Sequence, residues 1–313
     1  MKINNTKPIY GKITLLAILV SLITYFIYKN IEDFDILLKV ESTYLILLTI
    51  TLLLGLTLNG MINKYIMEPF HIFLKAKEWF GLAVTTSFYN LITPFRGGMI
   101  SKAAYLKSKH KFSYTKFLAS MAGVYAIQFW MISLLGIISM IVIFIRYDIF
   151  NLIVSTIFLG LFLVLTAVIF FRLEFPVHKN RILNKLFEIG NGWLILKKNK
   201  KILTITIFVT ISQIILSLIA QIVVYKAIGV HISIIQAIFL STIGAVATIA
   251  TITPGNLGIT EAVAVLSALV LGITPVQSLS SAIVGRVVQT AVVLILGPIF
   301  SYILIKKPKL ESK

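Results

Sequence analysis

The chain has 313 residues, of which 58% are hydrophobic and 13% charged, whereas an average soluble domain carries roughly 25% charged residues. This composition excludes an ordinary soluble globular protein and indicates a polytopic membrane protein. The sequence contains no cysteine, which excludes disulfides, thiolate metal sites and cysteine nucleophiles. Its longest polar stretch, residues 172–201, is too short for a second domain, so we expect residues 1–313 to form a single membrane domain.

Six apolar runs predict helices that cross the bilayer, because each approaches or exceeds the roughly 20 residues that a span needs. They are residues 13–28, 43–62, 117–145, 149–171, 202–225 and 275–305. The first run follows lysines but lacks a small-residue cleavage site, so we expect it to be retained as a helix. The predicted fold is an all-α polytopic membrane protein.

The charged residues predict the orientation of these spans. Lysine and arginine gather near the N-terminus, in segments 64–77, 102–116 and 179–201, and after residue 305. The segments 29–41 and 146–148 are acidic or neutral. Since cytoplasmic loops carry the excess of basic residues, we expect a multi-pass protein of the cell (cytoplasmic) membrane with both termini inside the cell.

Two further apolar segments, 79–105 and 232–272, share the pattern I-T-P-x-x-x-G. Proline removes a backbone donor and glycine permits unusual dihedrals, so each pattern predicts a broken helix. Six spans already satisfy the charge pattern, so these segments are expected to be re-entrant hairpins that enter from opposite faces. This arrangement is typical of an inverted repeat, here with halves 1–145 and 149–313. The predicted helix-break residues are Pro94, Gly97 and Gly98 in the first hairpin and Pro254, Gly255 and Gly258 in the second.

Glu261 and Arg286 lie in apolar surroundings, where each charge costs roughly 2.5 to 3.5 kcal/mol at the bilayer centre. A Gly-Ile-Thr-Pro turn separates their segments, so we predict that the two side chains approach each other. They either line a substrate route or form an ion pair that only fixes the fold. Gln289 is a further candidate, because it follows Arg286 by three positions and shares its helix face.

Arg96 in the first break and Lys102, about one helical turn after Gly98, are candidates to hold a phosphate. The second half of a broken helix begins with unpaired backbone N–H groups that attract anions, and guanidinium matches phosphate oxygens. Alternatively, both residues belong only to the basic cytoplasmic loop. The lysine run 102–116 favours anionic lipid head groups over nucleic acid as partner.

The histidines are scattered, and no nucleotide-binding or hydrolase motif occurs in the sequence, so we expect no metal, no cofactor and no catalytic residue. Amide side chains within apolar runs are expected to hydrogen-bond between helices. They include Asn59, Asn63, Gln128, Gln213, Gln221 and Gln236.

The segment from Pro254 to Glu261, followed by Arg286 and Gly297, is similar to the C-terminal signature of the flippase-like membrane domain of lysylphosphatidylglycerol synthases. The first signature of that family is matched by Asn90, Pro94, Arg96, Gly97 and Gly98.

The chain departs from the family pattern at three places. It has Met99 where an acidic residue is frequent, Lys102 where an arginine is frequent, and no Glu-Arg pair in segment 121–128. Full-length synthases also carry a soluble aminoacyl-transferase domain, for which the chain has no length, so we expect no synthesis of lysylphosphatidylglycerol.

The resemblance implies movement of a phospholipid or lipid-linked head group between leaflets, with Arg96 engaging the phosphate and Glu261 and Arg286 lining the route. A lipid flippase is therefore the leading hypothesis. The alternative is a membrane-embedded transferase or an accessory subunit in a glycolipid or polyprenyl-phosphate pathway. A weaker third hypothesis is an ion-coupled transporter of a small solute, with Glu261 as proton carrier.

Overall fold

The computed structural model describes residues 31–170 and 199–305, and every regular element within these ranges is helical. The predicted all-α class is confirmed. After a 3₁₀ helix over Ile31–Lys39, the α-helices are α2 (Ser42–Met67), α3 (Ala76–Ile92), α4 (Gly97–His110), α5 (Tyr114–Tyr147), α6 (Leu152–Phe170), α8 (Lys200–Ala227), α9 (Ile234–Ala247), α10 (Ile259–Leu269) and α11 (Pro275–Ile305).

Five of the described helices, α2, α5, α6, α8 and α11, are long and apolar enough to cross a membrane. They confirm five of the six predicted spans, and the sixth, residues 13–28, lies outside the described residues. The longest of them, α5, begins where the Ser113 hydroxyl accepts a hydrogen bond from the Lys116 N–H and ends at Asp148 in a left-handed conformation. The protein is therefore a multi-pass membrane protein.

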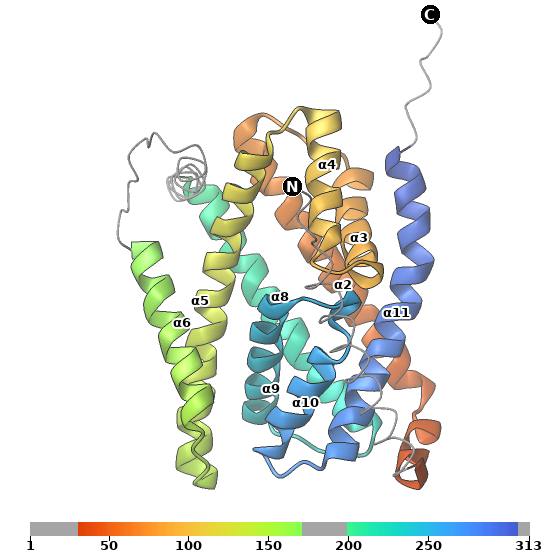
Figure 1. Cartoon of the computed structure of the whole chain (residues 1–313), viewed down its shortest axis with the longest axis vertical. Helices are drawn as coiled ribbons and strands as arrows, with labels where there is room; N and C mark the ends of the chain where they lie inside the picture. The colour runs from red at the N-terminus through yellow and green to blue at the C-terminus, as the bar shows by residue number, and fades with distance from the viewer. Residues whose placement is uncertain (1–30, 171–198, 306–313) are drawn as a thin grey trace, which may run out of the picture.

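The two segments with the shared pattern form broken helical hairpins. The first consists of α3 and α4, which turn back at residues 93–96. The second consists of α9 and α10, joined by two short 3₁₀ turns at Thr248–Ala250 and Pro254–Asn256. Figure 1 shows the first hairpin in the upper half of the molecule and the second in the lower half, with their tips meeting near mid-height. The opposed hairpins agree with the sequence prediction, and the inverted repeat stays a prediction.

Buried apolar side chains form two main clusters at different heights along the spans. The upper cluster includes Ile62, Ile66, Leu82, Leu106, Phe117, Val124 and Val209. The lower cluster includes Leu48, Met140, Ile143, Val224, Tyr225, Phe239 and Val284. Between their two sets of positions, α2 carries Asn59, α5 carries Gln128 and α8 carries Gln213. The spans are thus apolar towards both ends and carry amide side chains between them.

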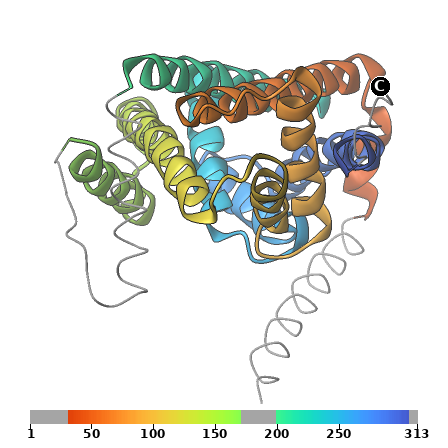
Figure 2. The same cartoon turned by 90° about the horizontal axis from the view of Figure 1, so that it is seen from above.

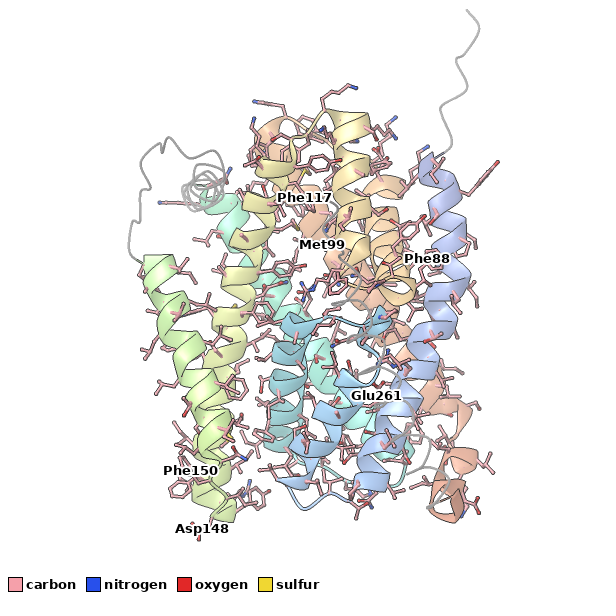
Figure 3. The ribbon with its side chains drawn as sticks, viewed as in Figure 1. Phe88, Met99, Phe117, Asp148, Phe150 and Glu261 are labelled. Atoms are coloured by element: carbon pink, nitrogen blue, oxygen red, sulfur yellow. The ribbon has the colours of Figure 1, made fainter. Side chains whose placement is uncertain are left out.

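Packing around the first hairpin depends on glycines that allow close approach. A Cβ at Gly98 would collide with the backbone carbonyl of Thr86, because α4 lies directly on α3 there. A Cβ at Gly297 would collide with the ring of Phe88, which projects from α3 towards α11 (Figure 3). The hairpin therefore reaches its position only because these two sites lack a side chain.

We predict that Gly98→Ala destabilises the protein by about 1 to 3 kcal/mol, because the added methyl group meets a backbone atom that cannot rotate away. Thermal unfolding in detergent measures the effect as a lower Tm. Gly160→Ala is the matched control, since a Cβ at this position on α6 meets no atom within 4 Å. Equal Tm values for the two variants would contradict the packing assigned to Gly98.

Candidate functional site

The first helix break lies between Ile92 and Gly97. Thr93 is extended, with φ −123°, and Phe95 and Arg96 both adopt left-handed conformations with φ 55°. Gly97 and Gly98 lie in the first turn of α4, so the unusual dihedrals fall on non-glycine residues, where they are uncommon. This differs from the sequence expectation, because the glycines serve close packing rather than the turn itself. Backbone strain at such positions is characteristic of functional sites.

Asn90 caps the beginning of α4. Its side-chain oxygen accepts a hydrogen bond of 2.9 Å from the Gly98 N–H, and the Met99 N–H donates to the Arg96 carbonyl at 2.8 Å. These two backbone donors are engaged within the protein, although the sequence suggested that they would be open to an anion. The Arg96 side chain is therefore the main candidate for binding an anion at this break.

Arg96 connects the tips of the two hairpins. Its Nη2 donates a hydrogen bond to the backbone carbonyl of Thr248, in the 3₁₀ turn after α9. Its guanidinium carbon lies 5.7 Å from the centre of the Tyr125 ring on α5, which is within the range of a cation–π contact. Arginine has five N–H donors, so this arrangement leaves donors for an oxyanion.

The second break uses glycine for its backbone conformation. Gly255 and Gly258 have φ values of 58° and 83°, and Asn256 between them is also left-handed. α10 then begins at Ile259, with Glu261 in its first turn. A carboxylate at this position caps the helix and interacts favourably with the helix dipole.

Glu261 and Arg286 form a closely paired group, as the sequence predicted. Glu261 Oε1 accepts a hydrogen bond from Arg286 Nε at 2.7 Å and lies 2.5 Å from Nη2 in an ion pair, while Oε2 accepts from the Gly258 N–H at 2.7 Å. Arg286 Nη1 donates to the Gly255 carbonyl at 2.7 Å. Figure 3 shows Glu261 on α10, in the lower hairpin beside α11.

These contacts engage both oxygens of Glu261 and all three guanidinium nitrogens of Arg286. The geometry therefore favours the interpretation that the pair fixes the second break over the one in which it lines a route. Gln289 is exposed on α11, and no described hydrogen bond joins it to the pair. The structure thus brings Glu261 and Arg286 together and leaves Gln289 apart.

Lys102 lies inside the molecule rather than in the solvated basic loop. It is only 8% exposed, its Nζ donates to the Asn63 side-chain oxygen at 2.8 Å, and the same atom lies 5.7 Å from the Phe117 ring centre. Among the described residues no carboxylate lies within ion-pair distance of it. In the described part of the chain, Lys102 therefore has no acidic partner that would balance its charge.

A separate charged cluster holds the base of the first hairpin together. The Glu78 carboxylate contacts Tyr105 Oη and Lys109 Nζ, both at 2.8 Å, and His110 Nε2 at 3.2 Å. Burial acts to raise the pKa of Glu78, but hydrogen bonds from Lys109, the Lys75 backbone and Tyr105 outweigh it and lower this pKa to about 2. The carboxylate is therefore ionised at neutral pH and ties α3 to α4.

Several residues of the site were not identified from the sequence. For Asn63 the sequence predicted only that its amide hydrogen-bonds between helices, and nothing in the sequence linked it to Lys102. Tyr125 has no distinguishing signal, and Thr248 contributes a backbone carbonyl, which any residue would supply. Asn256 is buried, and its side-chain oxygen has no hydrogen-bond partner among the described residues.

Together these features define a class: a helical multi-pass membrane protein whose two broken hairpins meet tip to tip near the mid-height of its spans. The family model for the lysylphosphatidylglycerol synthase TM region matches residues 12–297, so the chain belongs to this family. No curated protein and no solved structure matches the chain. Membership of this family indicates a function related to membrane lipids.

We predict that Glu261→Gln lowers stability by about 3 kcal/mol, because Arg286 would keep its charge without a counterion. The double variant Glu261→Gln/Arg286→Gln should recover part of this loss, since both charges are then removed. Thermal unfolding of Glu261→Gln, Arg286→Gln and the double variant in detergent measures the coupling free energy between the two side chains. Unchanged Tm values in all of them would contradict a fold-fixing role for the pair.

Proposed function

We propose that the protein is a flippase-like transporter that moves a phospholipid or a lipid-linked polar head group between the leaflets of the cytoplasmic membrane. The observation that carries this proposal is the contact between the two hairpin tips, made by Arg96 and the Thr248 carbonyl between the two apolar clusters. Broken helices that meet at the membrane midplane are typical of transport sites. The acyl chains would stay in the surrounding lipid while the head group passes the tips.

The proposed orientation follows from the charged helix ends. Lys75, Lys109 and Lys116 lie at the ends of α3, α4 and α5 that point upwards in Figure 1, where α11 also ends. Asp148 lies at the opposite end of the molecule, as Figure 3 shows. The positive-inside rule then puts the upper end, where α11 ends, in the cytoplasm. With residues 13–28 as a sixth span, the proposal places the N-terminus on the same side.

In this proposal the charged residues have different roles. Arg96 engages the lipid phosphate, because its guanidinium stands at the tip of the first hairpin with N–H donors left over. Lys102 adds positive potential one and a half turns further along α4. Glu261 and Arg286 hold the second tip in shape, through the Gly255 carbonyl and the Gly258 N–H, so that it can face Arg96.

The alternative of a membrane-embedded transferase needs a carboxylate that can exchange protons near the phosphate. Both oxygens of Glu261 are engaged, and Glu78 is held ionised by Lys109 and Tyr105 at the base of the hairpin. Neither acid is placed as a general acid or base towards Arg96, which favours transport. An accessory role in a glycolipid or polyprenyl-phosphate pathway would show itself through chemical change of the lipid.

The test is a leaflet-accessibility assay with acyl-labelled fluorescent phospholipids in proteoliposomes. Arg96→Ala should lower the rate of transfer about tenfold, which is the loss expected for one hydrogen-bonded charged contact. Arg96→Lys should give an intermediate rate, because ammonium keeps the charge and loses the planar fork. Arg146→Ala, at an exposed position near the end of α5, is the matched control and should transfer as the wild type does.

Equal rates for Arg96→Ala and the wild-type protein would contradict the assignment of Arg96. A wild-type protein without transfer of any lipid would contradict the transporter proposal. Mass spectrometry of the recovered lipid completes the experiment, since a covalently altered lipid would favour the transferase alternative.

A further inference from the structure

Three amide side chains form a hydrogen-bonded chain across three spans. Gln128 on α5 donates to Gln213 on α8 at 2.9 Å, and Gln213 donates to Asn59 on α2 at 3.1 Å. Asn59 in turn donates to the Gly55 carbonyl of its own helix at 3.1 Å. We call Gln128, Gln213 and Asn59 the amide chain. It lies between the upper and lower apolar clusters on each of the three helices.

The amide chain links the two cationic residues of the first hairpin. At one end, Gln128 lies one turn from Tyr125, whose ring faces the Arg96 guanidinium. At the other end, Asn59 lies one turn from Asn63, which accepts the hydrogen bond from Lys102. Residues three or four apart share a helix face, so these groups face a common interior side. Figure 2, seen from above, shows α2 and α8 along one side, α5 along the next, and α4 opposite them.

The amide chain is accessible. Asn59 is exposed, and Gln128 and Gln213 are both half-buried, although all three lie within spanning helices. Polar side chains at this depth are disfavoured against lipid, so accessible amides indicate a surface that meets water or a polar ligand. An amide nitrogen has two hydrogens and its oxygen two lone pairs, and the bonds within the chain use only some of them. The remaining capacity suits hydroxyl groups, which both donate and accept.

The same surface lacks a carboxylate that could bind a cationic head group. Among the described acidic residues, the Glu261 carboxylate is already bonded to Arg286 and the Gly258 N–H. The Glu78 carboxylate is bonded to Lys109, His110 and Tyr105. Of the other acids whose side chains are described, Asp35 lies in the 3₁₀ helix Ile31–Lys39. Glu41, Glu68 and Asp148 lie at helix ends rather than beside the amide chain. The charges next to the amide chain, Arg96 and Lys102, are positive.

We propose that the amide chain binds the head group of the transported lipid and selects a phosphate that carries an uncharged, hydroxyl-bearing group, such as glycerol or a sugar. The phosphate lies at Arg96 and the hydroxyl groups along Gln128, Gln213 and Asn59. Amine-bearing head groups are disfavoured, because they would meet two cations and no open carboxylate. This inference rests on the proposed transport function and adds the class of head group to it.

The test measures lipid binding by native mass spectrometry, with three lipids of equal acyl chains. Phosphatidylglycerol has the negative phosphate and the hydroxyl groups, phosphatidylethanol has the same charge without hydroxyl groups, and lysylphosphatidylglycerol adds amines. The wild-type protein should bind phosphatidylglycerol about fivefold more tightly than phosphatidylethanol, as expected for roughly one hydrogen bond, and should bind lysylphosphatidylglycerol less tightly than either. Gln213→Leu should remove the preference over phosphatidylethanol and leave phosphatidylethanol binding unchanged.

Gln221→Leu is the matched control, because Gln221 is a half-buried glutamine two turns further along α8 and outside the amide chain. It should keep the wild-type preference. Equal binding of phosphatidylglycerol and phosphatidylethanol by the wild-type protein, tighter binding of lysylphosphatidylglycerol, or an unchanged preference in Gln213→Leu would overturn the inference. Should Gln213→Leu fail to fold, Gln128→Leu replaces it with the same expected result.

The same variants in the leaflet-accessibility assay separate this inference from the proposed function. Transfer without the binding preference would overturn the head-group assignment and leave transport intact. The binding preference without any transfer would overturn transport and retain the site as a lipid-binding site.

Discussion

The structure depends on one constraint, namely that backbone polar groups exposed by a broken helix inside a membrane need partners from the protein. In the first break, the Asn90 side chain accepts the Gly98 N–H. In the second break, Arg286 binds the Gly255 carbonyl and Glu261 accepts the Gly258 N–H. The charged pair that looked most like a substrate site in the sequence is therefore first a set of partners for unwound backbone.

The same constraint bears on where the proposed lipid head group would bind. All three guanidinium nitrogens of Arg286 contact Glu261 or the Gly255 carbonyl, whereas Arg96 makes a single described hydrogen bond, to the Thr248 carbonyl. That bond joins the two hairpins through a contact that a phosphate oxygen could replace, since both acceptors are oxygens of similar size. Exchange between a carbonyl of the opposite hairpin and a lipid phosphate would couple head-group binding to separation of the tips.

The sequence was sufficient for features that depend on local pattern. Apolar runs predicted the five described spans, the repeated I-T-P-x-x-x-G pattern predicted both broken hairpins, and the cost of isolated charges predicted that Glu261 and Arg286 meet. Prediction from the sequence failed where the role of a side chain depends on a residue far away in the chain. Gly98 was assigned to the turn, yet it is needed for the approach of α4 to the Thr86 carbonyl. The sequence left open whether Lys102 holds a phosphate or belongs to the basic loop, because its partner Asn63 lies 39 positions away.

One departure of this chain from its family's pattern removes a negative charge from the neighbourhood of Arg96. Met99, at a position where an acidic residue is frequent in the family, lies with its sulfur 3.6 Å from the Tyr125 hydroxyl, beside Arg96. An acid here would neutralise Arg96, and a methionine does not. Lys102 likewise donates its hydrogen bond to the neutral Asn63 rather than to a carboxylate. Neither cation has a carboxylate partner in the described part of the chain, and α5 contributes Gln128 rather than a charged pair. These charges support the proposed head group, which brings its own negative charge and no positive one.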